Sequence, residues 1–175
     1  MRTVVLGPRP AELEALIARR RALGLDTFDE VWEGEYHMSP APHPRHAFLA
    51  VVMARVLGPR ADVRGVIALG PCNIGEPDNF RVPDASVHRS MPDTVFIPTA
   101  ALVVEIVSPD DETWAKLGFY AAHGVEEVLI VDPATRAVTW LALTAAGDGY
   151  VETDHSAVLD VAAADLAAEI DWPTV

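Results

Sequence analysis

The sequence predicts an α/β domain in which helices flank a mixed central sheet. Two apolar and mostly β-branched runs, residues 101–108 and 128–132, are typical of strands buried on both faces. Helix signals fill the segment between them, so these strands are expected to lie parallel in a right-handed βαβ unit over residues 101–132. The run 137–143 follows a turn at Pro133 and is expected to pair antiparallel, which makes the sheet mixed.

The N-terminal part of the chain predicts a helix at residues 10–23. Pro10 suits its first position, the arginines at 19–21 suit the negative end of the helix dipole, and Gly24 ends it. Turn residues and periodicity predict the elements that follow: a hairpin over 28–38 that turns at Glu33 and Gly34, an amphipathic helix over 46–57, a strand over 63–69, a loop over 70–80 and a short strand over 82–88.

A capped helix is predicted between the two buried strands. Ser108 suits the N-cap, Pro109 the first helical position and Asp111 the third. This helix is expected to run to about His123 and to end at Gly124. The elements expected after the run 137–143 are a turn at 147–149, a last strand near Tyr150 and a short helix over 160–170.

Length and composition favour one domain, residues 1–175, with a substantial core. The single cysteine, Cys72, excludes an internal disulfide and a cysteine-type zinc site, and the apolar runs are too short to span a membrane. Because no signal peptide is recognisable, a cytoplasmic location is expected. A net charge of −13 argues against a broad nucleic-acid surface, although arginines cluster at 19–21 and again at Arg55, Arg60 and Arg64.

Glu105 is the most informative residue, because it places a charge in the middle of an apolar strand. A buried carboxylate is costly unless a partner compensates it. A second acid, Asp84, lies in a neighbouring predicted strand, and Lys116 lies on the helix after Glu105, with Tyr120 one turn further on. Two carboxylates and a lysine suit Mg²⁺-dependent phosphodiester cleavage, since the acids hold the cation and the lysine orients water and stabilises developing charge.

Each of these residues also has a structural explanation. Asp84 would then be a turn acid, Glu105 one half of a buried ion pair and Lys116 a solvated helix residue. His46, with His43 three residues before it, could form a metal pair, but a capping or hydrogen-bonded histidine is the favoured explanation. Three tryptophans are expected in the core rather than as platforms for stacking bases: Trp32, Trp114 and Trp140.

Several short motifs occur in an order that resembles a known family. They are Pro83-Asp84, Val-Val-Glu105-Ile-Val-Ser-Pro, Lys116 with Tyr120, His123-Gly-Val125 and Val-Leu-Ile-Val-Asp132-Pro, preceded by Trp32-Glu33-Gly34-Glu35 and by Met38-Ser-Pro-Ala-Pro with His46. Over residues 28–143 these motifs resemble the bacterial Uma family of restriction endonucleases, which belongs to the PD-(D/E)XK nuclease superfamily. The resemblance implies a restriction-endonuclease-like fold.

The resemblance also implies an activity, which is hydrolysis of DNA phosphodiester bonds by an endonuclease that depends on Mg²⁺ or, alternatively, Mn²⁺. Asp84 and Glu105 would be the metal ligands. Lys116 would be the catalytic lysine, although the usual motif places this lysine two residues after the acid, where this chain has Val107. A homodimer is expected, since cutting both strands is easiest with two sites.

Three further residues are implied at the edge of the site. Glu35 would supply the accessory acid that such nucleases often carry early in the fold, with Glu33 as the less favoured choice. His46 and Tyr120 would be peripheral members.

Two other functions stay open at this point. The charge of −13 and the displaced lysine favour a non-catalytic descendant of the fold that binds a protein partner or nucleic acid. A metal-dependent hydrolase of a small nucleotide-like substrate is the other alternative, because it would need no basic groove.

Overall fold

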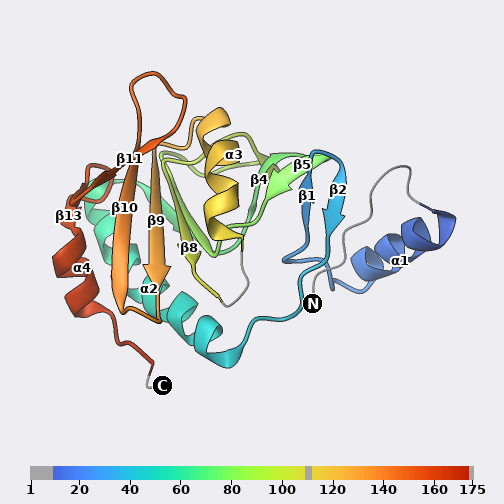
Figure 1. The fold of residues 1–175 in the computed structure, drawn as a ribbon, viewed down its shortest axis with the longest axis horizontal. Helices are drawn as coiled ribbons and strands as arrows, with labels where there is room; N and C mark the ends of the chain where they lie inside the picture. The colour runs from blue at the N-terminus through green and yellow to red at the C-terminus, as the bar shows by residue number, and fades with distance from the viewer. Residues whose placement is uncertain (1–9, 109–111, 174–175) are drawn as a thin grey trace.

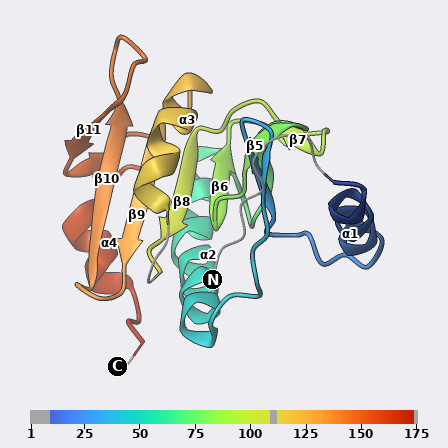
Figure 2. The same ribbon diagram turned by 45° about the vertical axis from the view of Figure 1, so that its right-hand side comes forward.

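The computed structural model describes residues 10–108 and 112–173, and two sheets with helices packed against them form its framework (Figure 1, Figure 2). The larger sheet has six strands in the order β11 (Tyr150–Thr153), β10 (Ala137–Leu143), β9 (Glu127–Asp132), β8 (Leu102–Ile106), β6 (Ala85–His88) and β3 (Ile67–Leu69). Strands β8 and β9 are parallel and the other neighbours are antiparallel, so the sheet is mixed, as predicted.

The second sheet is built from shorter strands that all precede β8 in the chain. Its order is β2 (Glu35–His37), β1 (Glu30–Trp32), β5 (Asn79–Arg81), β4 (Asn73–Glu76) and β7 (Phe96–Ile97). A small ribbon near the C-terminus pairs β12 (His155–Ser156) with β13 (Val161–Ala162).

The helices pack on both faces of the larger sheet and beside the β1–β2 hairpin. They are α1 (Ala11–Ala22), α2 (Pro44–Arg64), the 3₁₀ helix η1 (Thr113–Lys116), α3 (Leu117–Ala122) and α4 (Ala163–Glu169). Helices α2 and α4 cover one face of the six-stranded sheet and α3 covers the other, while α1 packs beside the β1–β2 hairpin (Figure 1, Figure 2). Within the described ranges, no helix is both long and apolar enough to cross a membrane.

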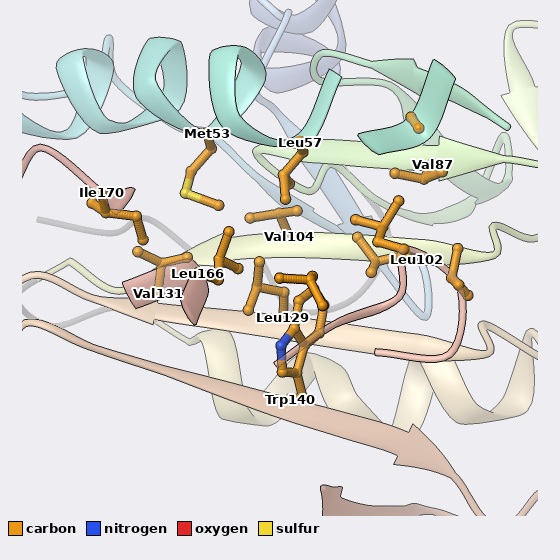
Figure 3. Packing of buried hydrophobic residues seen from close by; sticks show 14 of the residues in the cluster. Met53, Leu57, Val87, Leu102, Val104, Leu129, Val131, Trp140, Leu166 and Ile170 are labelled. Atoms are coloured by element: carbon orange, nitrogen blue, oxygen red, sulfur yellow. The ribbon is translucent and has the colours of Figure 1, made fainter. Parts of the chain in front are cut away.

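Strand β8 is the centre of the packing, because its side chains alternate between two cores. Leu102, Val104 and Ile106 point into the larger core, which they share with α2 and α4 (Figure 3). Val103 points to the opposite face, into the core that contains Phe119 and Tyr120 of α3. Glu105 has the same parity as Val103, so the alternation directs its carboxylate toward α3.

Most predicted elements are present with small changes at their ends. The helix predicted at 10–23 is α1, and the hairpin over 28–38 is β1–β2. Its turn has positive φ at both Glu33 and Gly34, the geometry of the turns that hairpins prefer. The parallel pair β8–β9 and the strands and helix after it also match the prediction: β10, β11 and α4.

Three predictions were wrong in the region between the hairpin and β8. Helix α2 extends to Arg64, where the helix prediction stopped at residue 57, and Gly65 ends it in a left-handed conformation. The strand predicted at 63–69 is therefore shortened to β3. The segment predicted as a loop at 70–80 instead contains the β4–β5 hairpin. Ile74 and Phe80 are buried in it, but the turn-forming residues around them hid this apolar pattern in the sequence.

Two smaller differences concern the segment after β8 and the tryptophans. The cap predicted at 109–111 lies outside the described residues, and the part of the helix that follows is η1 and then α3. Trp140 is in the core, as predicted, and Trp32 is half-buried. Trp114 is 58% exposed, so its assignment to the core was wrong.

Replacing Gly75 tests the close packing of β4 against α3. Gly75 has φ +117°, and a Cβ there would collide with the backbone oxygen of Asn79 and lie 2.7 Å from Cζ of Phe119. We expect Gly75→Ala to lower the free energy of unfolding by roughly 2–4 kcal/mol, from backbone strain and overpacking together. Urea denaturation measures the change.

Gly118→Ala is the matched control, because a Cβ at Gly118 in α3 would meet open space. It should stabilise the protein by up to about 1 kcal/mol through helix propensity. A Gly75→Ala protein as stable as the wild type would contradict the packing described for β4.

Candidate active site

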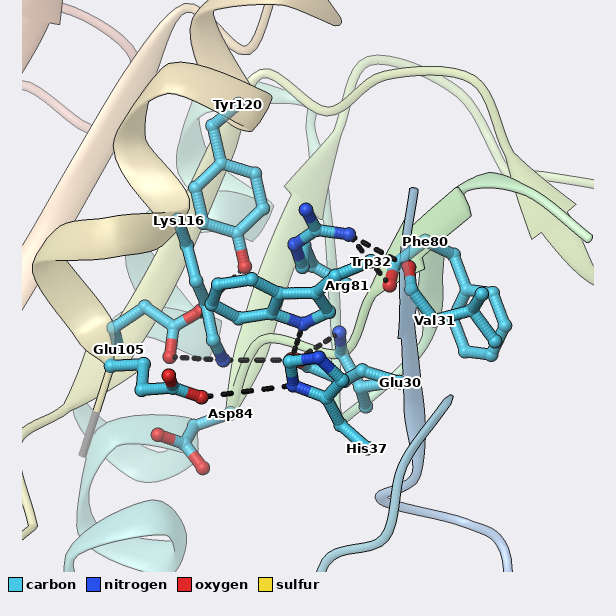
Figure 4. A network of polar contacts seen from close by, with 12 residues as sticks. Glu30, Val31, Trp32, His37, Phe80, Arg81, Asp84, Glu105, Lys116 and Tyr120 are labelled. Carbon is cyan, nitrogen blue, oxygen red and sulfur yellow. Dashed lines mark hydrogen bonds and ion pairs between the residues drawn. The ribbon is translucent and has the colours of Figure 1, made fainter. Parts of the chain in front are cut away.

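The site is built around the carboxylate of Glu105, which β8 delivers into the layer between the larger sheet and α3 (Figure 4). Glu105 is only 4% exposed. The hydroxyl of Tyr120, on α3, donates a hydrogen bond of 2.5 Å to Oε1 of Glu105. A buried carboxylate in an apolar strand therefore has a donor supplied from the helix above it.

Lys116 supplies the positive charge. Its Nζ lies 3.2 Å from Oε1 and 3.1 Å from Oε2 of Glu105, and its side chain is 13% exposed. Lys116 ends η1, one turn before Tyr120, so the same helical segment brings both side chains to Glu105. It is also the only lysine in the sequence, whose other twelve basic side chains are arginines.

Glu30 on β1 is the second carboxylate that contacts this lysine, and sequence reasoning missed it. Nζ of Lys116 lies 2.9 Å from Oε1 of Glu30. The same oxygen accepts 2.7 Å from the backbone N–H of Val82, and Oε2 accepts 2.7 Å from the indole N–H of Trp32. Glu30 is buried, so it repeats the pattern that singled out Glu105: an acid inside a strand. That pattern could have identified it.

Asp84 lies directly beside Glu105, immediately before β6. Its backbone N–H donates 2.9 Å to the carbonyl of Val104, and its Oδ2 accepts 2.7 Å from the N–H of Ile106. These two bonds attach Asp84 to the residues on either side of Glu105. Asp84 and Glu105 therefore lie next to each other at the same level of the sheet (Figure 4).

His46, in the first turn of α2, fixes the other oxygen of Asp84. Its Nε2 lies 2.7 Å from Oδ1 of Asp84, and its Nδ1 lies 2.9 Å from the hydroxyl of Ser108. If Nε2 carries the proton, the imidazole donates to the carboxylate and accepts from the serine. His43 has the capping role instead, accepting from the backbone N–H of Arg45 at the start of α2.

The electrostatics of the cluster follow from its burial. Burial raises the pKa of the Glu105 carboxyl to about 7; the nearby Lys116 ammonium opposes this shift, whereas the charges of Asp84 and Glu30 add to it. Burial acts to lower the pKa of Lys116, but Glu105 and Glu30 outweigh it and raise that pKa overall. Burial also raises the pKa of Tyr120, which keeps its hydroxyl a donor.

Two residues could hold a metal ion here, Asp84 and Glu105. Among residues 10–108 and 112–173, no three His, Cys, Asp or Glu side chains are grouped so that they could share one ion. Two carboxylates nevertheless suit Mg²⁺, which usually keeps several waters and takes only one or two protein carboxylates. Each oxygen of Asp84 accepts one protein hydrogen bond and retains further acceptor capacity.

Glu35, the accessory acid predicted from the sequence, does not contact the cluster around Lys116. Glu35 lies in β2 opposite Trp32, and in the part of the chain that the structure describes no hydrogen bond or ion pair joins it to Lys116, Glu105 or Asp84. Glu33 is 73% exposed and contacts Arg81 instead. Glu30 takes the position against Lys116 because it lies at the other end of the hairpin, beside Val82.

A family model matches residues 25–172, which is most of the chain, and its description is Uma2, "Putative restriction endonuclease". The chain belongs to the Uma2 family. This match extends the resemblance found over residues 28–143 in both directions, and it includes every residue of the cluster described above.

A solved structure shows the same fold. It is described as a "putative nuclease belonging to DUF820" from Anabaena variabilis, with a TM-score of 0.64 and 17% sequence identity; the match covers 81% of this chain and 90% of that one. The restriction-endonuclease-like fold expected for the Uma2 family is therefore confirmed. A search of curated proteins found no match.

The raised pKa of Glu105 predicts that the metal-free protein loses stability as pH rises. The folded state holds a proton on Glu105 up to about pH 7, whereas the unfolded chain releases it near the ordinary value of 4.5. Stability contributed by the protonated carboxyl is therefore present below pH 4.5 and is lost between there and pH 7, by about 3 kcal/mol in total. Urea denaturation at pH 5, 6, 7 and 8 in EDTA measures the slope.

Glu105→Gln separates this effect from all other titrating groups, because glutamine cannot ionise. The fall in stability between pH 5 and pH 8 should be smaller in the variant than in the wild type by most of that amount, since part of it is already lost below pH 5. Parallel curves for the two proteins would show that Glu105 is ionised throughout this range.

Proposed function

We propose that this chain is a Mg²⁺-dependent endonuclease, able to use Mn²⁺ as well, that hydrolyses phosphodiester bonds of DNA. Asp84 and Glu105 would hold the metal, and Lys116 would act on the attacking water. One observation carries the proposal: the only lysine of the chain is buried between two carboxylates, Glu105 and Glu30, with Asp84 beside them. Membership of the Uma2 family supports a nuclease.

Stability alone does not account for this cluster. Glu30 and Glu105 both contact Lys116, and the charge of Asp84 acts on Glu105, so two acids share one ammonium with a third acid nearby. Buried ion pairs often contribute less to stability than apolar side chains of similar volume. A divalent cation next to Asp84 and Glu105 would cancel the repulsion between these two carboxylates, which supports a metal site.

The protein groups have separate tasks in this proposal. When bound, the metal would polarise the phosphodiester and acidify a coordinated water. Lys116 has three N–H donors: one can be shared by the two oxygens of Glu105 and a second can point at Glu30, which leaves a third for a water or phosphate oxygen. Glu30 keeps Lys116 in place, and Tyr120 holds Oε1 of Glu105.

Asp84 is prepared for its task by its hydrogen bonds. The N–H of Ile106 and the imidazole of His46 each fix one of its oxygens, so the carboxylate has one orientation before a metal arrives. The hydroxyl of Ser108 in turn fixes the imidazole ring. Such supporting bonds typically tune metal affinity by roughly 10–100-fold.

Because the chain has a net charge of −13, two alternative functions are tested as well: a binding module and a hydrolase of small nucleotides. A binding module would need neither a metal nor Lys116, and a hydrolase of small nucleotides would not act on plasmid DNA. A plasmid and a small phosphodiester, bis(p-nitrophenyl) phosphate, offered in parallel distinguish these alternatives from the proposed endonuclease.

We expect Mg²⁺ to raise the melting temperature of the wild type and to support cleavage of plasmid DNA. Glu105→Gln should abolish the Mg²⁺-induced stabilisation, because one of two carboxylate ligands is lost. Cleavage should fall at least about 100-fold in Glu105→Gln, which loses a metal ligand, and in Lys116→Met, which loses the ammonium that stabilises developing negative charge. Differential scanning fluorimetry and a plasmid nicking assay measure the two effects.

A pair of substitutions on one hairpin supplies the control. Glu30→Gln should lower cleavage strongly, because Glu30 contacts Lys116, whereas Glu35→Gln should leave it near the wild-type rate. Equal effects of the two changes would show that the contact with Lys116 does not matter. A wild type that shows neither Mg²⁺ stabilisation nor cleavage of either substrate would exclude the proposed enzyme.

We further propose that the active form is a homodimer, because double-strand cleavage needs one site for each strand. Light scattering coupled to size exclusion should give twice the chain mass of 18.9 kDa at micromolar concentration. A monomer that nicks plasmid DNA without linearising it would contradict the proposed homodimer but would agree with the proposed nuclease function.

A further inference from the structure

Five flat side chains stack in a column beside the site. The His37 ring lies on Trp32 with centroids 4.6 Å apart; the Arg81 guanidinium lies 4.2 Å from the Trp32 centroid and 4.1 Å from that of Phe119. Phe119 in turn stacks on His123 at 3.9 Å. Figure 4 shows the first three groups of this ring column next to Glu30 and Tyr120.

Arg81 is the central member of the ring column, and its side chain is 2% exposed. Its Nη1 donates 2.8 Å to the carbonyl of Val31 on β1, while its flat face covers Phe119 on α3. Arg81 therefore fastens the β1–β2 hairpin to α3. These are the two parts of the fold that bring Glu30 and Lys116 together. The absence of a Cβ at Gly75 gives Phe119 the room to reach Arg81.

One hydrogen bond links the ring column to Glu30. The indole N–H of Trp32 donates 2.7 Å to Oε2 of Glu30, whose other oxygen lies 2.9 Å from Nζ of Lys116. Because Arg81 and His37 hold the two faces of the indole, the direction of that N–H is fixed. The hydrogen bond from the indole limits rotation of the Glu30 carboxylate. The position of the Lys116 ammonium in turn depends on how this carboxylate is oriented.

We propose that Trp32 is a positioning residue of this site, held by Arg81, which sets the Glu30 carboxylate and through it the place of Lys116. The inference rests on the proposed function of Lys116 as the catalytic lysine. It differs from plain packing in one respect: the N–H of the indole matters, and not only its ring.

Trp32→Phe tests this difference, since phenylalanine keeps a ring in the column and lacks the N–H. Trp172→Phe is the matched control, because Trp172 is half-buried and its indole N–H donates 3.0 Å to the carbonyl of Ala167, away from the site. Lys116 is the only lysine, so protein labelled with ¹³C-lysine gives one ¹³Cε–¹H signal, which reports on Lys116 without any metal or substrate.

We expect Trp32→Phe to move the Lys116 signal in the metal-free protein, and Trp172→Phe to leave it in place. In the plasmid assay with Mg²⁺, kcat of Trp32→Phe should fall by about tenfold or more while KM changes by less than about twofold, because a displaced catalytic group lowers turnover rather than binding. Trp172→Phe should change neither constant.

Each other result has a definite meaning. An unmoved Lys116 signal in Trp32→Phe overturns the proposal, with or without a loss of activity, since Trp32 then does not act through the lysine. A change confined to KM overturns it as well, because Trp32 would be a substrate contact. A moved signal in a chain whose wild type cleaves nothing supports the positioning of Lys116 and overturns only the nuclease function.

Discussion

The buried ammonium of Lys116 is the constraint on which the rest of the site depends. A cation largely removed from water is tolerable only where carboxylates surround it closely. Glu105 meets this need from β8 and Glu30 meets it from β1, so the six-stranded sheet, the five-stranded sheet and α3 must converge at one point. The same requirement accounts for the short bond from Tyr120, which holds one oxygen of Glu105 in place.

The fold satisfies this constraint with ordinary packing elements. Alternation along β8 gives three side chains to the core under α2 and turns Glu105 the other way, toward α3. The ring column ties the β1–β2 hairpin to α3 through Arg81, and Gly75 keeps the space for it. Beside Glu105, Asp84 is held by hydrogen bonds with Ile106 and His46. Asp84 and Glu105 therefore come from separate segments of the chain.

Local signals predicted much of the fold and part of the site. The β-branched runs around Glu105 and Val128–Asp132 gave the parallel pair, because such runs have few alternatives to a buried strand. The β4–β5 hairpin escaped prediction, since its strands are short and rich in turn formers and only their pairing stabilises them. Helix α2 was predicted too short, because its buried face continues to Ala61 past Gly58 and Pro59.

The sequence by itself determined that Glu105 needs a partner, because no local environment compensates a carboxylate inside an apolar strand. It also indicated Asp84 and Lys116 as candidates through spacing and family resemblance. Only the tertiary structure decided that Glu30, and not Glu35, is the other acid at Lys116. Both lie on the same hairpin and carry the same charge, but contact with Lys116 depends on how the hairpin docks on β5 and α3. Docking is a long-range property, fixed by Arg81 and its neighbours rather than by residues adjacent in the chain.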